Sequence, residues 1–162
     1  MDSDLFMQKR DRIRDELKKA FPLVPIPASH RRADDVVHPE VDEDVQKFLG
    51  RPWDHVHLED WIRSVSPAAI RRGTSNAFFK YYLPSLLHTV FDDMGYAYLA
   101  LDAVLPDNPG FEPRPDWKVF RQSFQPIQAE AVASFLEFIR EETDPNGPDW
   151  FGADAGLSGL WN

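Results

Sequence analysis

The apolar positions at the start of the chain repeat with the period of an α-helix. One stripe of such a helix would carry Phe6, Ile13, Leu17, Ala20 and Phe21. Charged residues of both signs fill the remaining positions, as on the solvent face of an amphipathic helix. The pattern therefore predicts a helix over residues 2–21, with three prolines between residues 22 and 27 ending it.

Changes in composition divide the rest of the chain into three segments. Residues 22–39 are rich in proline and then in acidic residues, which predicts an extended connector. Residues 40–142 carry repeated apolar stripes and form the predicted helical core. Residues 143–162 combine glycine, proline and tryptophan, and this spacing of glycines and prolines predicts a tail without a regular element.

Helical spacing recurs several times inside the core segment. We expect helices at 40–49, 58–65, 68–72, 77–91 and 96–105, with a strand as the alternative at 96–105. A last helix is expected to begin at Ser123 or Pro126 and to end at Glu142. Ser66 and either Thr74 or Ser75 are the expected N-caps of the third and fourth of these helices. Pro84 lies inside the most apolar helix, where the missing amide hydrogen predicts a kink or a break.

No segment alternates apolar and polar residues for long enough to predict a strand with assurance. The 162 residues are the length of one ordinary domain. We therefore expect a single compact all-α domain of about five to seven helices joined by proline-rich loops.

Composition narrows the functional classes. The chain has no cysteine, which excludes disulfides, thiolate catalysis and metal sites that need a cysteine ligand. No apolar run has the length of a membrane span. The charged first residues, Met1 to Arg14, differ from a secretory signal, so the expected location is the cytoplasm.

The net charge of −9 argues against nucleic acid as a partner, because phosphate binding needs clustered basic groups. One basic cluster, Arg63, Arg71, Arg72 and Lys80, is interpreted as a solvated helix face. The opposite charge is concentrated in Asp34, Asp35, Glu40, Asp42, Glu43 and Asp44. Such a run either keeps the chain soluble or steers a basic protein partner toward it.

Large aromatic residues distinguish the tail. Trp150, Phe151 and Trp161 are spaced by glycines, and an unfolded tail rarely carries two tryptophans. These side chains either fold back onto the domain or dock on a partner or a second copy. Together with the acidic run, they are the candidate partner-binding residues.

Candidate chemistry is sparse. His55 and His57 lie beside Asp54 and Asp60, which would suit a small metal-dependent or histidine-dependent enzyme. No phosphate-binding glycine loop, nucleophile elbow or His-Glu-x-x-His motif is present. An enzyme is therefore disfavoured, and the sequence assigns no catalytic residue, metal or cofactor.

Three blocks resemble a family of small bacterial proteins that share a domain of unknown function. The blocks are Trp53-Asp54, the Ala-Phe-Phe-Lys-Tyr-Tyr-Leu-Pro-Ser-Leu-Leu run after Asn76, and the Gln-x-x-Ala-x-x-x-Phe-Leu pattern that begins at Gln128. The resemblance covers roughly residues 49–139. Its motif residues are mostly apolar and describe a core, so the resemblance implies no activity and no site residue.

The resulting expectation is a protein-binding module, most concretely an immunity-type inhibitor that covers a basic toxin. Small size, acidic charge and the bacterial resemblance support it by analogy. A small enzyme at the histidine pair and a self-associating structural protein remain alternatives. The oligomeric state is left open.

Overall fold

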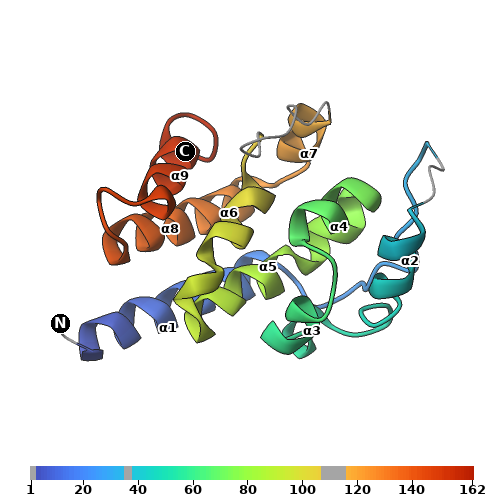
Figure 1. The fold of residues 1–162 in the computed structure, drawn as a ribbon, viewed down its shortest axis with the longest axis horizontal. Helices are drawn as coiled ribbons and strands as arrows, with labels where there is room; N and C mark the ends of the chain where they lie inside the picture. The colour runs from blue at the N-terminus through green and yellow to red at the C-terminus, as the bar shows by residue number, and fades with distance from the viewer. Residues whose placement is uncertain (1–2, 35–37, 107–115) are drawn as a thin grey trace. The chain divides into compact units, whose positions relative to one another are not determined.

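Helices form all of the regular structure in the computed structural model, which describes residues 3–34, 38–106 and 116–162 (Figure 1). These ranges hold nine α-helices, two short 3-10 helices and no strand. The prediction of an all-α protein is therefore confirmed, with more helices than expected. Within the same ranges, no helix combines the length and the apolar character needed to cross a lipid bilayer.

The chain forms two compact units. The terminal unit comprises Met1–Phe21 and Val104–Asn162, and the central unit comprises Pro22–Ala103. The colour bar of Figure 1 locates the helices of each unit along the chain.

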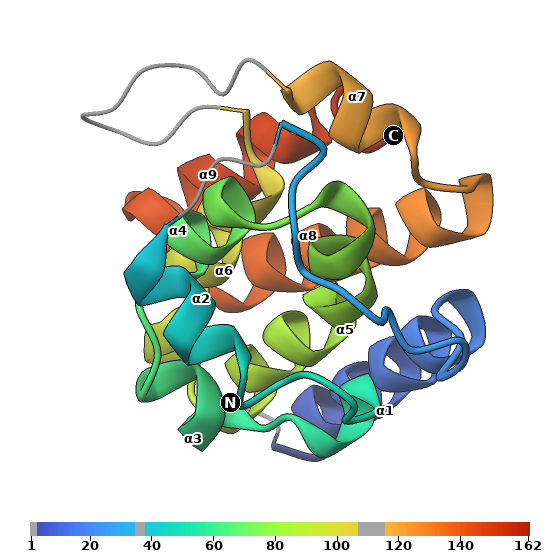
Figure 2. The same cartoon turned by 90° about the vertical axis from the view of Figure 1, so that its right-hand side faces the viewer.

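The terminal unit is built around one long helix, α8 (Pro126–Glu142). On it pack α1 (Ser3–Ala20) and α9 (Pro148–Leu157), and α7 (Trp117–Gln122) precedes it. Both views place α8 and α9 side by side (Figures 1 and 2). Buried apolar residues of the unit include Ile13, Leu17, Phe120, Val132, Phe135, Leu136 and Phe138. Their periodic spacing on α1 and α8 explains why these two helices bury one face each.

The central unit is organised by α5 (Asn76–Asp92). Around it lie η1 (Trp53–His55), α3 (Leu58–Ile62), α4 (Pro67–Gly73) and η2 (Met94–Tyr96), and α6 (Ala97–Val104) follows. The short helix α2 (Pro39–Val45) packs on α4, and the two lie next to each other in Figure 2. Nearly every position of α5 from Phe78 to Phe91 is buried, so this helix supplies the core of the unit.

Two predicted helix starts are confirmed in detail. Ser66 Oγ accepts a hydrogen bond from the Ala69 amide at 3.3 Å, and Pro67 occupies the first turn of α4. Ser75 Oγ accepts from the Phe78 amide at 3.2 Å and caps α5. Residues 96–105 are largely helical, as α6, rather than a strand.

Three expectations need correction. The tail contains α9, which begins with Pro148 in its first turn, where a missing amide hydrogen costs nothing. A break at Pro84 is absent, because α5 continues past this buried proline. Arg71 does not lie on a solvated face, since its side chain is only 1% exposed.

Gly156 explains why a glycine-containing tail can still be helical. A Cβ at this position would lie 2.7 Å from Cδ1 of Leu136 on α8. Glycine therefore lets the two helices approach closely, and its role is packing rather than flexibility.

Candidate functional site

The acidic run of the central unit is largely engaged in holding its own unit together. Oδ1 of Asp42 lies 2.8 Å from Nε2 of His30, a residue that is 7% exposed. The His30 carbonyl accepts the Ser75 amide at 2.9 Å, and its ring meets Phe78 edge-on. Asp42 therefore joins α2 to the connector and, through His30, to the start of α5.

Asp44 has a similar internal role. Its Oδ2 accepts the Val65 amide at 2.7 Å, and its Oδ1 lies 3.5 Å from Nζ of Lys47. A Cβ on Gly73 would come within 3.0 Å of Val41, so α2 also lies tightly against α4. These contacts fix the orientation of α2 within its unit.

Two carboxylates of the run remain open to solvent. Glu40 and Glu43 are exposed, and neither forms an ion pair with any of the residues that the structure describes. Residues three apart on a helix share a face, so both carboxylates project from one side of α2. Asp34 is exposed and paired with Nε of Arg32 at 3.2 Å, and Asp35 lies outside the described residues.

Trp161 belongs to the core of the terminal unit. It is 2% exposed, and its Nε1 donates to the Val104 carbonyl at 2.7 Å. The Arg121 guanidinium lies 4.6 Å from the centre of its ring, while Nε of Arg121 donates to the Leu160 carbonyl. Because this side chain is buried in its own unit, it is not available to anchor a partner.

Phe151 and Trp150 are placed differently. Phe151 is 57% exposed on the first turns of α9, and Trp150 is half-buried with its ring 5.4 Å from that of Phe151. The edge-on pair supports the exposed ring from one side. Of the three aromatic residues predicted to meet a partner, Phe151 presents the largest accessible apolar surface.

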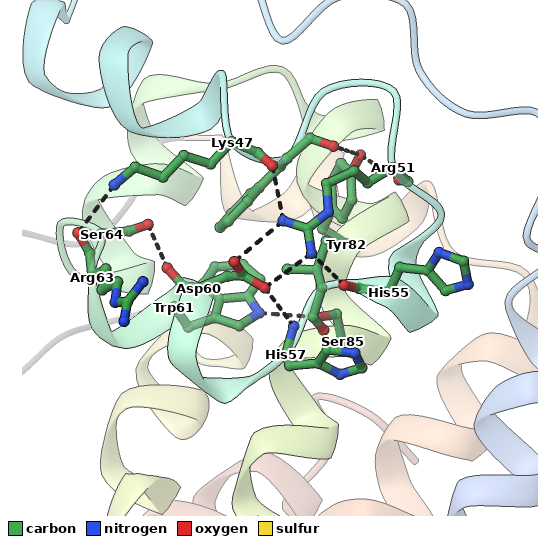
Figure 3. A network of polar contacts seen from close by, with 12 residues as sticks. Lys47, Arg51, His55, His57, Asp60, Trp61, Arg63, Ser64, Tyr82 and Ser85 are labelled. Atoms are coloured by element: carbon green, nitrogen blue, oxygen red, sulfur yellow. Dashed lines mark hydrogen bonds and ion pairs between the residues drawn. The ribbon is translucent and has the colours of Figure 1, made fainter.

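The region of the predicted histidine pair contains a closed polar network (Figure 3). Arg51 faces Asp60 with both terminal nitrogens, each 3.2 Å from one carboxylate oxygen. The same guanidinium donates to the Lys47 carbonyl at 3.0 Å and to the His55 carbonyl. Asp60 Oδ2 also accepts the His57 amide at 2.9 Å, which secures the start of α3.

The charge state of Asp60 follows from these contacts. Partial burial raises its pKa, but the hydrogen bonds from Arg51 and the His57 amide, together with the Arg51 charge, outweigh burial. The net result is a pKa below the ordinary value of 3.8. Asp60 is therefore an ionised partner of Arg51, and its oxygens are occupied.

Buried hydroxyl groups attach this network to α5. Tyr82 donates to the carbonyls of Phe48 and Arg51, at 2.5 and 2.8 Å. Nε1 of Trp61 donates to Ser85 Oγ at 3.0 Å, and Ser85 donates to the Val56 carbonyl at 2.6 Å. Burial raises the pKa of Tyr82 to about 12, so its hydroxyl stays protonated as a donor at neutral pH.

This arrangement does not provide the ligand set that the sequence suggested for an enzyme. His55 is exposed, and its Nε2 lies 3.8 Å from Oδ1 of Asp54. His57 is exposed at the start of α3, while Asp60 is held by Arg51. The described residues contain no group of three or more histidine, aspartate or glutamate side chains that could hold a metal ion.

Arg51 is the residue that sequence reasoning missed here. It stands between Gly50 and Pro52, and Gly50 adopts a positive φ of 77°. That turn brings Arg51 back toward α3, where Asp60 lies nine positions later. A lone arginine between two turn residues was the available signal, but its partner is set by tertiary structure.

The chain was compared with family models, curated proteins and solved structures, and none of the three comparisons finds a match. The resemblance to the bacterial family of unknown function therefore stays a prediction.

Proposed function

We propose that this chain is a protein-binding module that covers a basic surface of another protein, most concretely as an immunity-type inhibitor of a basic toxin. The observation that carries the proposal is the pair of exposed carboxylates, Glu40 and Glu43, on a helix whose other acids are turned to internal partners. The net charge of −9 acts in the same direction.

Glu40 and Glu43 are suited to binding a partner because the helix that carries them, α2, has a fixed orientation within its unit. The contacts of Asp42 with His30 and of Asp44 with the Val65 amide hold α2 in place before any partner arrives. Binding then orders little backbone, which lowers the entropy cost of association. Complementary charge at such a surface raises the association rate, and salt screens the effect.

An apolar anchor is supplied by the terminal unit. Phe151 exposes more than half of its surface, and aromatic residues commonly carry a large share of binding energy in protein interfaces. We expect Phe151 to slow the dissociation of the complex, whereas Glu40 and Glu43 raise the association rate. The two features belong to different units, and each is tested separately.

The first experiment is a tagged pull-down from the host cell at low and moderate salt, with mass spectrometry of the bound proteins. The proposal predicts one basic partner in near-equal amount, released as salt rises. Co-expression then tests whether the chain protects cells from that partner. A partner that is acidic, or that binds equally well at all salt concentrations, would contradict the proposal.

Charge-matched variants make the experiment specific. Glu40→Gln with Glu43→Gln removes two carboxylates from α2, and Glu130→Gln with Glu137→Gln removes two exposed carboxylates from α8. Both changes take the net charge from −9 to −7. Only the α2 pair is expected to weaken capture, because only that pair belongs to the proposed surface.

A further inference from the structure

The turn between α8 and α9 contains an asparagine followed by a glycine, Asn146-Gly147. The chain has three other asparagines, at positions 76, 108 and 162, and the first two precede alanine and proline. Asn146 is exposed, and Gly147 is the N-cap of α9 without a side chain to close the helix.

This pair has the arrangement needed for an intramolecular reaction. The backbone nitrogen of Gly147 can attack Cγ of the Asn146 side chain, forming a nitrogen–carbon bond and expelling the side-chain nitrogen as ammonia. Water then opens the five-membered imide at either carbonyl, which yields aspartate or isoaspartate. Water is consumed, ammonia is released, and no oxidation or reduction occurs. Glycine favours the step because no Cβ hinders the approach of its nitrogen.

Two hydrogen bonds in the folded turn act on this reaction. The backbone N–H of Gly147 donates to the Asp144 carbonyl at 2.8 Å. The backbone N–H of Asn146 donates to Asp144 Oδ1 at 3.0 Å. The first bond occupies the attacking nitrogen, so attack requires the turn to open. The turn is at the surface and α9 has no side-chain cap, so this opening needs only local motion.

We propose that Asn146 is a site of spontaneous deamidation, at a rate set by opening of the turn that Asp144 holds. Conversion to either product adds one carboxylate, so the net charge changes from −9 to −10. The isoaspartate product also adds a methylene to the backbone beside Gly147. That product is expected to lose the bond from the Gly147 amide to Asp144 and to loosen the start of α9.

The experiment is incubation of the full purified chain in mildly alkaline buffer made with heavy-oxygen water. Digestion in ordinary water and peptide mass spectrometry follow. Incorporated heavy oxygen marks each conversion that took place during incubation. The proposal predicts label at position 146 in both aspartate and isoaspartate peptides, with Asn76, which precedes Ala77 inside α5, as the unlabelled internal control.

Two variants test the mechanism. Gly147→Ala is expected to slow conversion by about tenfold, because its Cβ restricts the attacking nitrogen. Asp144→Ala removes the side-chain acceptor of the Asn146 backbone N–H and is expected to raise the rate of deamidation. Unfolding in denaturant is expected to raise the same rate. Absence of label at position 146 in the folded chain, equal label at Asn76, or one unchanged rate in all variants would each overturn the proposal.

Discussion

Nε2 of His30 lies 2.8 Å from Oδ1 of Asp42, a partly buried contact that joins the connector to α2. This relationship changes the meaning of the acidic run. Asp42 serves the fold of the central unit, while its neighbour Glu43 faces solvent. Adjacent acids in one run therefore have different tasks.

The two tasks can be separated by substitution. Asp42→Ala leaves a buried imidazole without its carboxylate and is expected to lower the free energy of unfolding by about 1–3 kcal/mol. Glu43→Ala is expected to change it by less than about 0.5 kcal/mol, as for other exposed residues. Chemical denaturation measures both values. Equal effects of the two substitutions would show that the His30 contact does not support α2.

Asp60 gives a prediction with a defined dependence on pH. Its pKa is depressed in the folded state, so its contribution to stability is present above 3.8 and is lost as pH falls through the folded value. Asp60→Asn is expected to cost about 1–3 kcal/mol at neutral pH, because a charge-assisted pair with Arg51 is lost. Denaturation at a series of pH values should show this difference shrinking below pH 3.8. A difference that stays constant into strong acid would contradict the assignment of charge to Asp60.

Tyr82 gives a prediction for the stability of the protein at alkaline pH. Its pKa is about 12 in the folded chain, against an ordinary value of 10.0. The unfolded chain therefore ionises first, and stability should fall as pH rises from 10 toward 12. Tyr82→Phe is expected to cost about 1–3 kcal/mol at neutral pH, since the carbonyls of Phe48 and Arg51 lose their donor. The same variant should show a shallower alkaline loss in thermal melts. Tyr81 and Tyr96 still contribute to that loss, because burial also raises the pKa of Tyr81 and raises that of Tyr96 to about 12. An identical alkaline slope in both proteins would rule out this role for Tyr82.

Trp161 and Phe151 form a matched pair of aromatic residues in the terminal unit. Trp161→Ala removes a buried ring and its bond to Val104, and it is expected to lower the free energy of unfolding by about 3–5 kcal/mol. Phe151→Ala should leave stability within about 0.5 kcal/mol of the parent. With a purified partner, Phe151→Ala should instead speed dissociation by about tenfold or more, the loss typical of an aromatic anchor. Thermal melts and binding kinetics separate these outcomes, and a Phe151 variant that melts early would place this ring in the core.

Local signals predicted the helices well where caps and apolar spacing agreed. Ser66 and Ser75 cap α4 and α5 because each serine oxygen accepts a hydrogen bond from a backbone amide three residues later. This local interaction does not depend on the tertiary structure. The prediction of an irregular tail was wrong because a glycine such as Gly156 is typical of flexible segments. Here its role is the close approach to Leu136, which depends on the packing of α9 on α8.

The candidate surface was predicted less completely for the same reason. Charge along the chain located Glu40 and Glu43, but it could not separate them from Asp42 and Asp44. The partners of those two, His30 and the Val65 amide, are 12 and 21 positions away. Burial of Arg71 and Trp161 likewise depends on long-range packing that composition does not encode.

The measurement that tests the central claim most directly is the association rate with the captured basic partner, recorded as a function of salt. The parent chain is compared with two variants of equal net charge, Glu40→Gln/Glu43→Gln and Glu130→Gln/Glu137→Gln. The proposal predicts a slower and less salt-dependent association only for the α2 variant, with all three chains equally stable. Equal association rates for the two variants would show that α2 is not the surface that meets the partner.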